Sequence, residues 1–328
     1  MRTPLFRGLI ALPSAALLVA CDTEPPTRTE ARANEPSFQK FHRSEWSEPV
    51  RLGPPIDSPE ANEQGPALSP DGLALYFTSN RAGGFGGTDI WVSHRACEAC
   101  PWQEPVNLGP TINSVAGDGQ PTFATDPHVM FFNSARPGGH GGADLYVSRR
   151  TDPNDDFGWG PPVNLGPLVN TADNEAGAEY VERELGRDAV LYFNRGIIML
   201  QRADIYAAPV TRDGMVLDIA APVSELNDPT VNDGGVAVRR DGREIIFWSN
   251  RNSPPDRVQG DLFVSTRANV HREWSTPENL GAPVNSVVFD EIAASLSNDG
   301  RTLLIVRTMP GGAGGLHLWM STRTPSGK

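Results

Sequence analysis

The chain has 328 residues, and its 40 acidic and 28 basic side chains leave a formal charge of −12 at pH 7. This excess of acid argues against nucleic acid as a partner and against an electrostatic hold on anionic lipid. The 33 glycines and 30 prolines predict many tight turns, and no long amphipathic helical pattern occurs.

The first twenty residues have the features of an export signal. Arg2 and Arg7 precede an apolar run, 9–20, that is too short to span a membrane as an ordinary helix. The run ends at Cys21 in a pattern that resembles the bacterial lipobox, in which the cysteine is lipidated and the chain is cut before it. An ordinary signal peptide with an unrelated cysteine is the alternative. We therefore predict an exported lipoprotein of the bacterial cell envelope. Its acyl chains would hold it on the periplasmic side of a membrane, and either the inner or the outer membrane is compatible with the sequence.

Residues 21–44 contain proline, threonine and arginine with few apolar side chains, which predicts a flexible tether. A folded domain is expected over 45–323, followed by a short tail, 324–328.

Five copies of one repeat occupy the folded domain. Each starts with an acid, passes through a turn into a short apolar strand, and ends in a second apolar strand that opens with aspartate in four copies. A Trp-x-x-Pro-x-x-Leu-Gly element, degenerate in one place, lies between copies and supplies a further strand. Four strands per unit at this period predict a propeller blade. The copies centre on residues 64–95, 119–150, 176–210, 234–267 and 292–323.

One Trp-x-x-Pro-x-x-Leu-Gly element, residues 46–53, precedes every copy, and no such element follows the last copy. Its pairing with the blade of 292–323 would close the ring and remove an unpaired edge. We therefore predict an all-β fold: a five-bladed β-propeller of four-stranded blades, closed by this N-terminal strand.

The first copy contains the segments 66–72 (PALSPDG), 76–81 (YFTSNR) and 89–91 (DIW). These are similar to the WD40-like β-propeller repeat of exported bacterial proteins, which also builds the propeller of TolB-type proteins. The resemblance implies a protein-binding platform in the cell envelope. No Gly-x-Ser-x-Gly elbow occurs, so a serine-peptidase domain of the kind that accompanies some of these propellers is not expected.

An acid precedes the aligned turn position of every copy. It lies where the fourth strand of one blade is followed by the innermost strand of the next blade. Such a ring is expected at one mouth of the central channel, where it would suit Ca2+ or a polyol ligand. The alternative is that each acid accepts backbone N–H bonds from the connecting loop. The acids are Glu63, Asp118, Glu175, Asp233 and Glu291. No histidine pair has the spacing of a catalytic metal site.

An arginine follows the second strand of each blade, close to the aspartate that opens the third strand. We expect these residues to form an ion pair within each blade. In the fifth blade His317 replaces the aspartate, which is expected to leave Arg307 free for a partner. The arginines are Arg81, Arg136, Arg195, Arg251 and Arg307.

Glycine-rich loops separate the arginine from the third strand at 82–88, 137–143 and 310–315. They join two strands and do not lead into a helix, so they do not indicate a phosphate cradle. We predict that they face a partner on the same side as the acid ring. The candidate contact residues on this side are Phe85, His140, Arg307 and His317.

Cys97 and Cys100 are close together in sequence, and in an oxidising compartment a local disulfide is expected. A zinc site with His94 as a third ligand and a redox-active cysteine pair are the alternatives.

These features favour a non-catalytic, lipid-anchored scaffold that needs no cofactor and presents its loop face to an envelope protein. The alternatives are a glycan- or cation-binding propeller and a furanosidase-like glycoside hydrolase. A hydrolase needs two acids in unlike environments, which a symmetric ring does not supply. Three acids outside the ring could break the symmetry: Asp173, Glu179 and Asp290.

Overall fold

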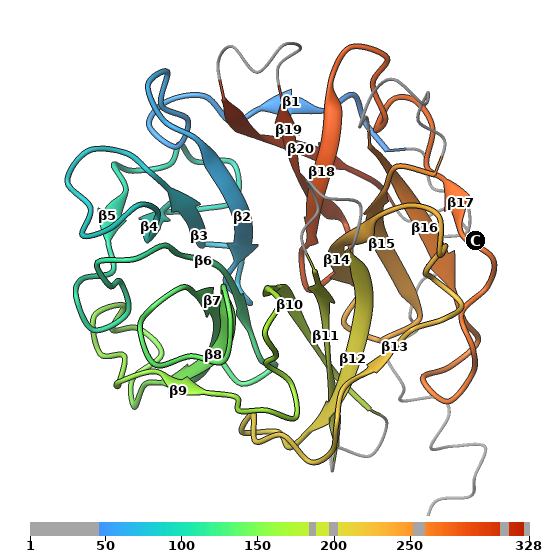
Figure 1. Cartoon of the computed structure of the whole chain (residues 1–328). Helices are drawn as coiled ribbons and strands as arrows, with labels where there is room; N and C mark the ends of the chain where they lie inside the picture. The colour runs from blue at the N-terminus through green and yellow to red at the C-terminus, as the bar shows by residue number, and fades with distance from the viewer. Residues whose placement is uncertain (1–45, 184–187, 197–202, 252–259, 309–314, 325–328) are drawn as a thin grey trace, which may run out of the picture. The chain divides into compact units, whose positions relative to one another are not determined.

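The computed structural model describes residues 46–183, 188–196, 203–251, 260–308 and 315–324. Within these ranges the chain forms twenty strands in five antiparallel sheets and no helix. Each sheet is one four-stranded blade, and the blades stand around a central axis (Figure 1). A helix long and apolar enough to cross a membrane is therefore also absent from these ranges. Cys21 and the tether of 21–44 lie outside them, so lipidation stays a prediction.

The strands of each blade follow one another outward from the axis. Blade one contains β2 (Glu63–Leu68), β3 (Ala74–Ser79), β4 (Asp89–His94) and β5 (Val106–Asn107). Blade two contains β6 (Asp118–Phe123), β7 (Val129–Ser134), β8 (Asp144–Arg149) and β9 (Val163–Asn164). Blade three contains β10 (Glu175–Glu182), β11 (Ala189–Arg195), β12 (Asp204–Val210) and β13 (Ala221–Pro222). Blade four contains β14 (Asp233–Val238), β15 (Glu244–Ser249), β16 (Asp261–Thr266) and β17 (Glu278–Asn279). Blade five contains β18 (Asp290–Leu296), β19 (Thr302–Thr308), β20 (Leu316–Thr322) and β1 (Val50–Arg51).

The predicted ring closure is confirmed. β1 pairs antiparallel with β20, with Val50 opposite Met320, and Trp46 forms an isolated bridge with Arg323. The Arg323 guanidinium lies 4.4 Å from the Trp46 ring centroid. The innermost strands β2, β6, β10, β14 and β18 contact one another in sequence, and β18 contacts β2. The N-terminal strand thus completes the last blade, as the unpaired fourth-strand motif requires.

The hydrophobic core lies between successive blades. Every residue of β3 and β15, the second strands of their blades, is buried, because neighbouring blades cover both faces of such a strand. Phe131 of blade two stacks on Tyr180 of blade three with ring centroids 5.9 Å apart. Each fully buried side chain of this size contributes about 1.5–3 kcal/mol. Similar clusters join the other neighbours around the ring, which makes the inner strands a rigid wall.

The inner strands also share a bulge near their midpoint. The bulged residue has a positive φ in four blades: 53° at Gly65, 50° at Gln120, 62° at Gly177 and 57° at Gly235. Glycine adopts this conformation without strain. A Cβ added to Gly65 would lie 2.7 Å from the Cα of Gln120, so the backbones of blades one and two are in contact here. The bulges therefore narrow the channel at one level.

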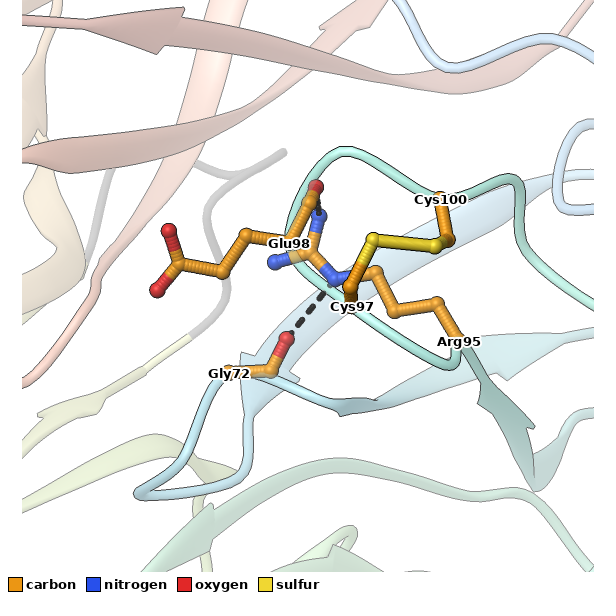
Figure 2. The surroundings of a disulfide bond; sticks show 5 residues. All are labelled: Gly72, Arg95, Cys97, Glu98 and Cys100. Carbon is orange, nitrogen blue, oxygen red and sulfur yellow. Dashed lines mark hydrogen bonds between the residues drawn. A yellow bond between two sulfur atoms is a disulfide. The ribbon is translucent and has the colours of Figure 1, made fainter.

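A disulfide joins Cys97 to Cys100 in the turn after β4 (Figure 2). Beside it, Arg95 donates hydrogen bonds from Nε to the Gly72 carbonyl at 2.8 Å and from Nη1 to the Glu98 carbonyl at 2.6 Å. The disulfide thus closes a turn that Arg95 ties to the first hairpin. His94 pairs with Asp156 across to blade two and is not directed to the sulfur atoms.

Candidate functional site

The five ring acids are fully buried, and each forms an ion pair with the arginine at the end of, or just after, the second strand of the same blade. The shortest N–O distances lie between 2.6 and 3.1 Å. The pairs are Glu63–Arg81, Asp118–Arg136, Glu175–Arg195, Asp233–Arg251 and Glu291–Arg307. The arginines were expected to pair with the third-strand aspartates, and that prediction is wrong.

The ring acids also hold the loops that connect the blades. Asp118 accepts hydrogen bonds from the Ser114 backbone N–H at 2.5 Å and from its hydroxyl at 2.7 Å. Arg136 donates to the Ile112 carbonyl at 2.5 Å. Equivalent backbone bonds reach the acids of blades three, four and five. This is the structural role that we considered as the alternative, while Ca2+ binding by the ring stays a prediction.

Burial raises the pKa of two ring acids. The pKa of Glu291 is raised to about 7 because its burial outweighs the opposing field of Arg307. Burial likewise raises the pKa of Glu63, against the attraction of Arg81. Desolvation of a carboxylate disfavours its ionised form, even beside one cation.

The four candidate contact residues fall into two groups. Phe85 and His140 are exposed at the tips of the first two glycine-rich loops. Arg307 and His317 are 4 % and 3 % exposed. Arg307 is bound to Glu291 at 2.8 Å, so the prediction that it is free for a partner is wrong. Most of the third glycine-rich loop, 310–315, lies outside the described residues.

The central channel is bordered by the middle of the five inner strands. The centres of water-sized molecules have about 40 Å³ there, and the empty space is about 390 Å³ when open solvent at the mouths is included. Small residues such as Gly65, Ala178 and Gly235 make up most of its described lining. Glu179 is the single ionisable side chain among these lining residues, and Gln120 projects from the neighbouring strand. The carboxyl and amide side chains of the channel therefore lie on blades two and three.

Glu179 is held in its neutral form. Burial raises its pKa to about 8, although the Thr122 hydroxyl and the Val238 backbone N–H oppose the shift. The Thr122 hydroxyl donates to Glu179 Oε2 at 3.2 Å. The Glu179 side chain is partly exposed at the channel wall, while protein atoms surround most of it. A carboxyl group that stays protonated at pH 7 is a hydrogen-bond donor and a proton source.

Gln120 is the second unusual group on this wall. It is the one non-glycine residue with positive φ in the described chain, a conformation that is uncommon for residues with a side chain. Its Oε1 is buried and has no hydrogen-bond partner within the described part of the molecule. Such strain and an unpaired polar atom are features that collect at ligand sites. Gln120 and Glu179 therefore form the candidate site.

The chain matches no family model and no curated protein, but its fold matches solved structures. It is similar to the catalytic domain of the Coprinopsis cinerea GH62 α-L-arabinofuranosidase, at 12 % identity over 86 % of this chain and 97 % of that one, with a TM-score of 0.55. A thermostable family-43 glycoside hydrolase matches at 12 % identity over 84 % and 97 %, with a TM-score of 0.54. The endo-arabinase from Bacteroides thetaiotaomicron matches at 14 % identity over 83 % and 97 %, with a TM-score of 0.55.

These comparisons correct three expectations. The matching structures reported above are glycoside hydrolases of the arabinofuranosidase and arabinase kind and not TolB-type repeat proteins, so the assignment to the TolB-type family is wrong. The expectations of a non-catalytic scaffold and of no enzymatic activity are contradicted by the same matches. At 12–14 % identity the likeness establishes the five-bladed fold, and any activity has to be argued from the site.

Proposed function

We propose that this protein is a glycoside hydrolase whose substrate enters the central channel beside Glu179. The feature that carries the proposal is a carboxyl group, with a pKa raised by burial to about 8, on the wall of an otherwise small-residue channel in a fold shared with arabinofuranosidases and arabinases. By analogy with those proteins, the substrate class to test first is the arabinofuranosides.

Glu179 has the chemistry of the general acid. Hydrolysis breaks the bond between the anomeric carbon and the leaving oxygen, adds the hydroxyl of water to that carbon, and transfers one proton to the leaving group. A carboxylic acid with a pKa near 8 keeps that proton at neutral pH and can deliver it to the leaving oxygen. Gln120 offers an amide that can hydrogen-bond a sugar hydroxyl from the adjacent strand.

One observation favours a second candidate, saccharide binding without hydrolysis. Glycosidases of the common kind use a second carboxylate as base or nucleophile, and Glu179 is the one carboxyl group on the described channel wall. A protonated Glu179 carboxyl and the Gln120 amide group would together recognise a polyol by hydrogen bonds alone.

The test is the hydrolysis of aryl arabinofuranosides and of arabinan by the wild-type chain and by Glu179→Gln. Loss of a general acid lowers kcat by about 10²–10⁴-fold, and the isosteric amide should leave saccharide binding in place. Glu182→Gln is the matched control, because Glu182 lies on the same strand but pairs with Arg212 at the surface. Binding of the same sugars without turnover would select the second candidate, and neither binding nor turnover would overturn both.

A further inference from the structure

The junction between the last and first blades differs chemically from the other four junctions. Elsewhere, an aspartate that opens the third strand stands beside an asparagine from the turn that follows the fourth strand, and in three blades a second asparagine from the fourth strand bonds to both. In these three blades the aspartate thus has two uncharged asparagine neighbours. The sets are Asp89, Asn107 and Asn113; Asp144, Asn164 and Asn170; and Asp261, Asn279 and Asn285. In blade five the same three places hold His317, Arg51 and Asp57.

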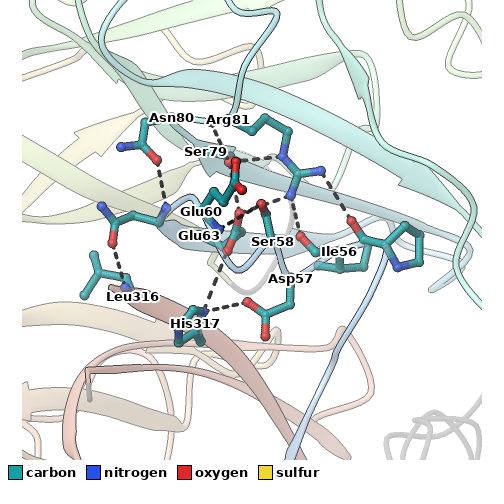
Figure 3. Close-up of polar contacts among 12 residues, drawn as sticks. Ile56, Asp57, Ser58, Glu60, Glu63, Ser79, Asn80, Arg81, Leu316 and His317 are labelled. Atoms are coloured by element: carbon teal, nitrogen blue, oxygen red, sulfur yellow. Dashed lines mark hydrogen bonds and ion pairs between the residues drawn. The ribbon is translucent and has the colours of Figure 1, made fainter. Parts of the chain in front are cut away.

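Together with Glu63, the residues at these places bring an imidazole and two carboxylates together in the protein interior (Figure 3). His317 Nδ1 lies 2.6 Å from Asp57 Oδ1 and 3.9 Å from Glu63 Oε2. One ligand atom from each residue lies within 4.8 Å of the other two, and all three side chains are buried. They come from β20, from the loop before β2, and from β2 itself, so the cluster spans the closure of the ring.

One atom in the cluster lacks a hydrogen-bond partner, and another lies between two groups that it cannot satisfy together. Glu63 Oε2 is buried and makes no hydrogen bond within the described residues, while Glu63 Oε1 is held by Arg81 at 3.1 Å. His317 Nδ1 lies within hydrogen-bond distance of both Asp57 Oδ1 and Arg51 Nη2, the latter at 2.9 Å. One ring nitrogen cannot donate to the carboxylate and accept from the guanidinium at once. An electron-pair acceptor placed between Oε2, Oδ1 and Nδ1 would satisfy all three.

We propose that Asp57, Glu63 and His317 bind one divalent transition-metal cation, for which Zn2+ is the probe. Zinc combines imidazole nitrogen with carboxylate oxygen in its protein sites, whereas Ca2+ prefers oxygen alone. The other carboxylate oxygens are already held, by Arg81 on Glu63 and by Arg51 Nε on Asp57, which orients the ligand atoms as outer-shell groups do. On metal binding Arg51 Nη2 would release His317 Nδ1, while Arg51 Nε keeps its bond to Asp57.

The bound cation would cross-link the two ends of the ring. His317 belongs to the last blade, while Asp57 and Glu63 belong to the segment that enters the first. The loop between them is also clamped by Asn62, whose backbone N–H donates to Asn80 and whose side chain accepts from the Leu316 N–H. Metal binding should therefore appear as stability of the whole propeller.

The test compares Zn2+ binding and thermal unfolding of the full chain with those of the triple variant Arg51→Asn, Asp57→Asn, His317→Asp. This variant restores the set of one aspartate and two asparagines that three other blades use, so it is expected to fold. Wild type should bind one equivalent of Zn2+, and at about a hundred times the dissociation constant its unfolding midpoint should rise by several degrees. The triple variant should show neither effect, and Glu63→Gln should weaken binding.

Zinc held equally well by the triple variant would place the ion at surface histidines and overturn the proposal. Binding of less than one equivalent by the wild type would also overturn it. A zinc-edge anomalous map of wild-type crystals gives a second reading that does not depend on how any variant folds, and density at His317 is the expected result. These outcomes are independent of glycoside hydrolysis, since Glu179 lies on the channel wall of another blade.

Discussion

Replacement of Asp118 by asparagine should destabilise the propeller far more than the loss of an average ion pair. Asp118 is fully buried, and its partner Arg136, 2.8 Å away, is 18 % exposed at the side chain. The amide keeps the shape but not the charge, and the guanidinium is left without an anion in the interior. Breaking a buried pair in this way costs about 3–5 kcal/mol. We expect the upper part of that range, because Ser114 also loses a charged acceptor for its backbone N–H and hydroxyl.

The assay is urea unfolding, in which the midpoint should fall while the slope stays constant. Glu182→Gln serves as the exposed control, since Glu182 and Arg212 are 22 % and 58 % exposed and such pairs contribute about 0–1 kcal/mol. Pairing Asp118→Asn with Arg136→Met in a double-mutant cycle isolates the coupling between the two groups. A loss below about 1 kcal/mol for Asp118→Asn would refute the claim that the ring acids hold the blades together.

Three further outcomes follow from individual contacts. The folded pKa of Glu179, about 8, is above its ordinary 4.5. Its contribution to stability is therefore full below pH 4.5 and is lost as pH rises toward 8, and Glu179→Gln should flatten that decline in pH-dependent unfolding. Reduction of Cys97–Cys100 should lower the unfolding free energy by about 2 kcal/mol, since the disulfide closes a very short loop, and circular dichroism should show the fold unchanged. Gly65→Ala should destabilise by more than about 1 kcal/mol, because its Cβ would meet backbone at 2.7 Å at positive φ. Gly87→Ala, with open space around it, is the control in the same unfolding assay.

The ring and its closure could be predicted because they depend on periodicity and on counting strands. A fourth-strand motif at residues 46–53 had no blade of its own, and the last copy had no fourth strand. An edge strand without a partner is unfavourable, so the two had to pair. The structure pairs β1 with β20 for that reason.

The partner of each arginine could not be predicted, because the sheet offers it two acids. Ser79, two residues before Arg81, lies opposite both Glu63 and Asp89 in the strand register. Which acid pairs with the arginine depends on backbone N–H groups that bind the other acid, and their positions cannot be read from the sequence spacing. Asp89 is satisfied by the Phe85 N–H at 2.5 Å and by other groups of its own glycine-rich turn, which leaves Arg81 to the buried Glu63.

The departures from fivefold symmetry indicate where function should be sought. A group present in every blade meets a need of every blade, as the acid–arginine pairs show. Glu179 has alanine, threonine or serine at the matching positions of the other inner strands, and Gln120 stands where three blades have glycine. Neither change helps to close a blade, since one introduces a poorly solvated carboxyl group and the other a strained backbone. Residues that destabilise the fold in this way are typical of sites where the side chain binds a ligand. The same reasoning applies to His317, since the last blade lacks the aspartate and asparagine set that three other blades contain.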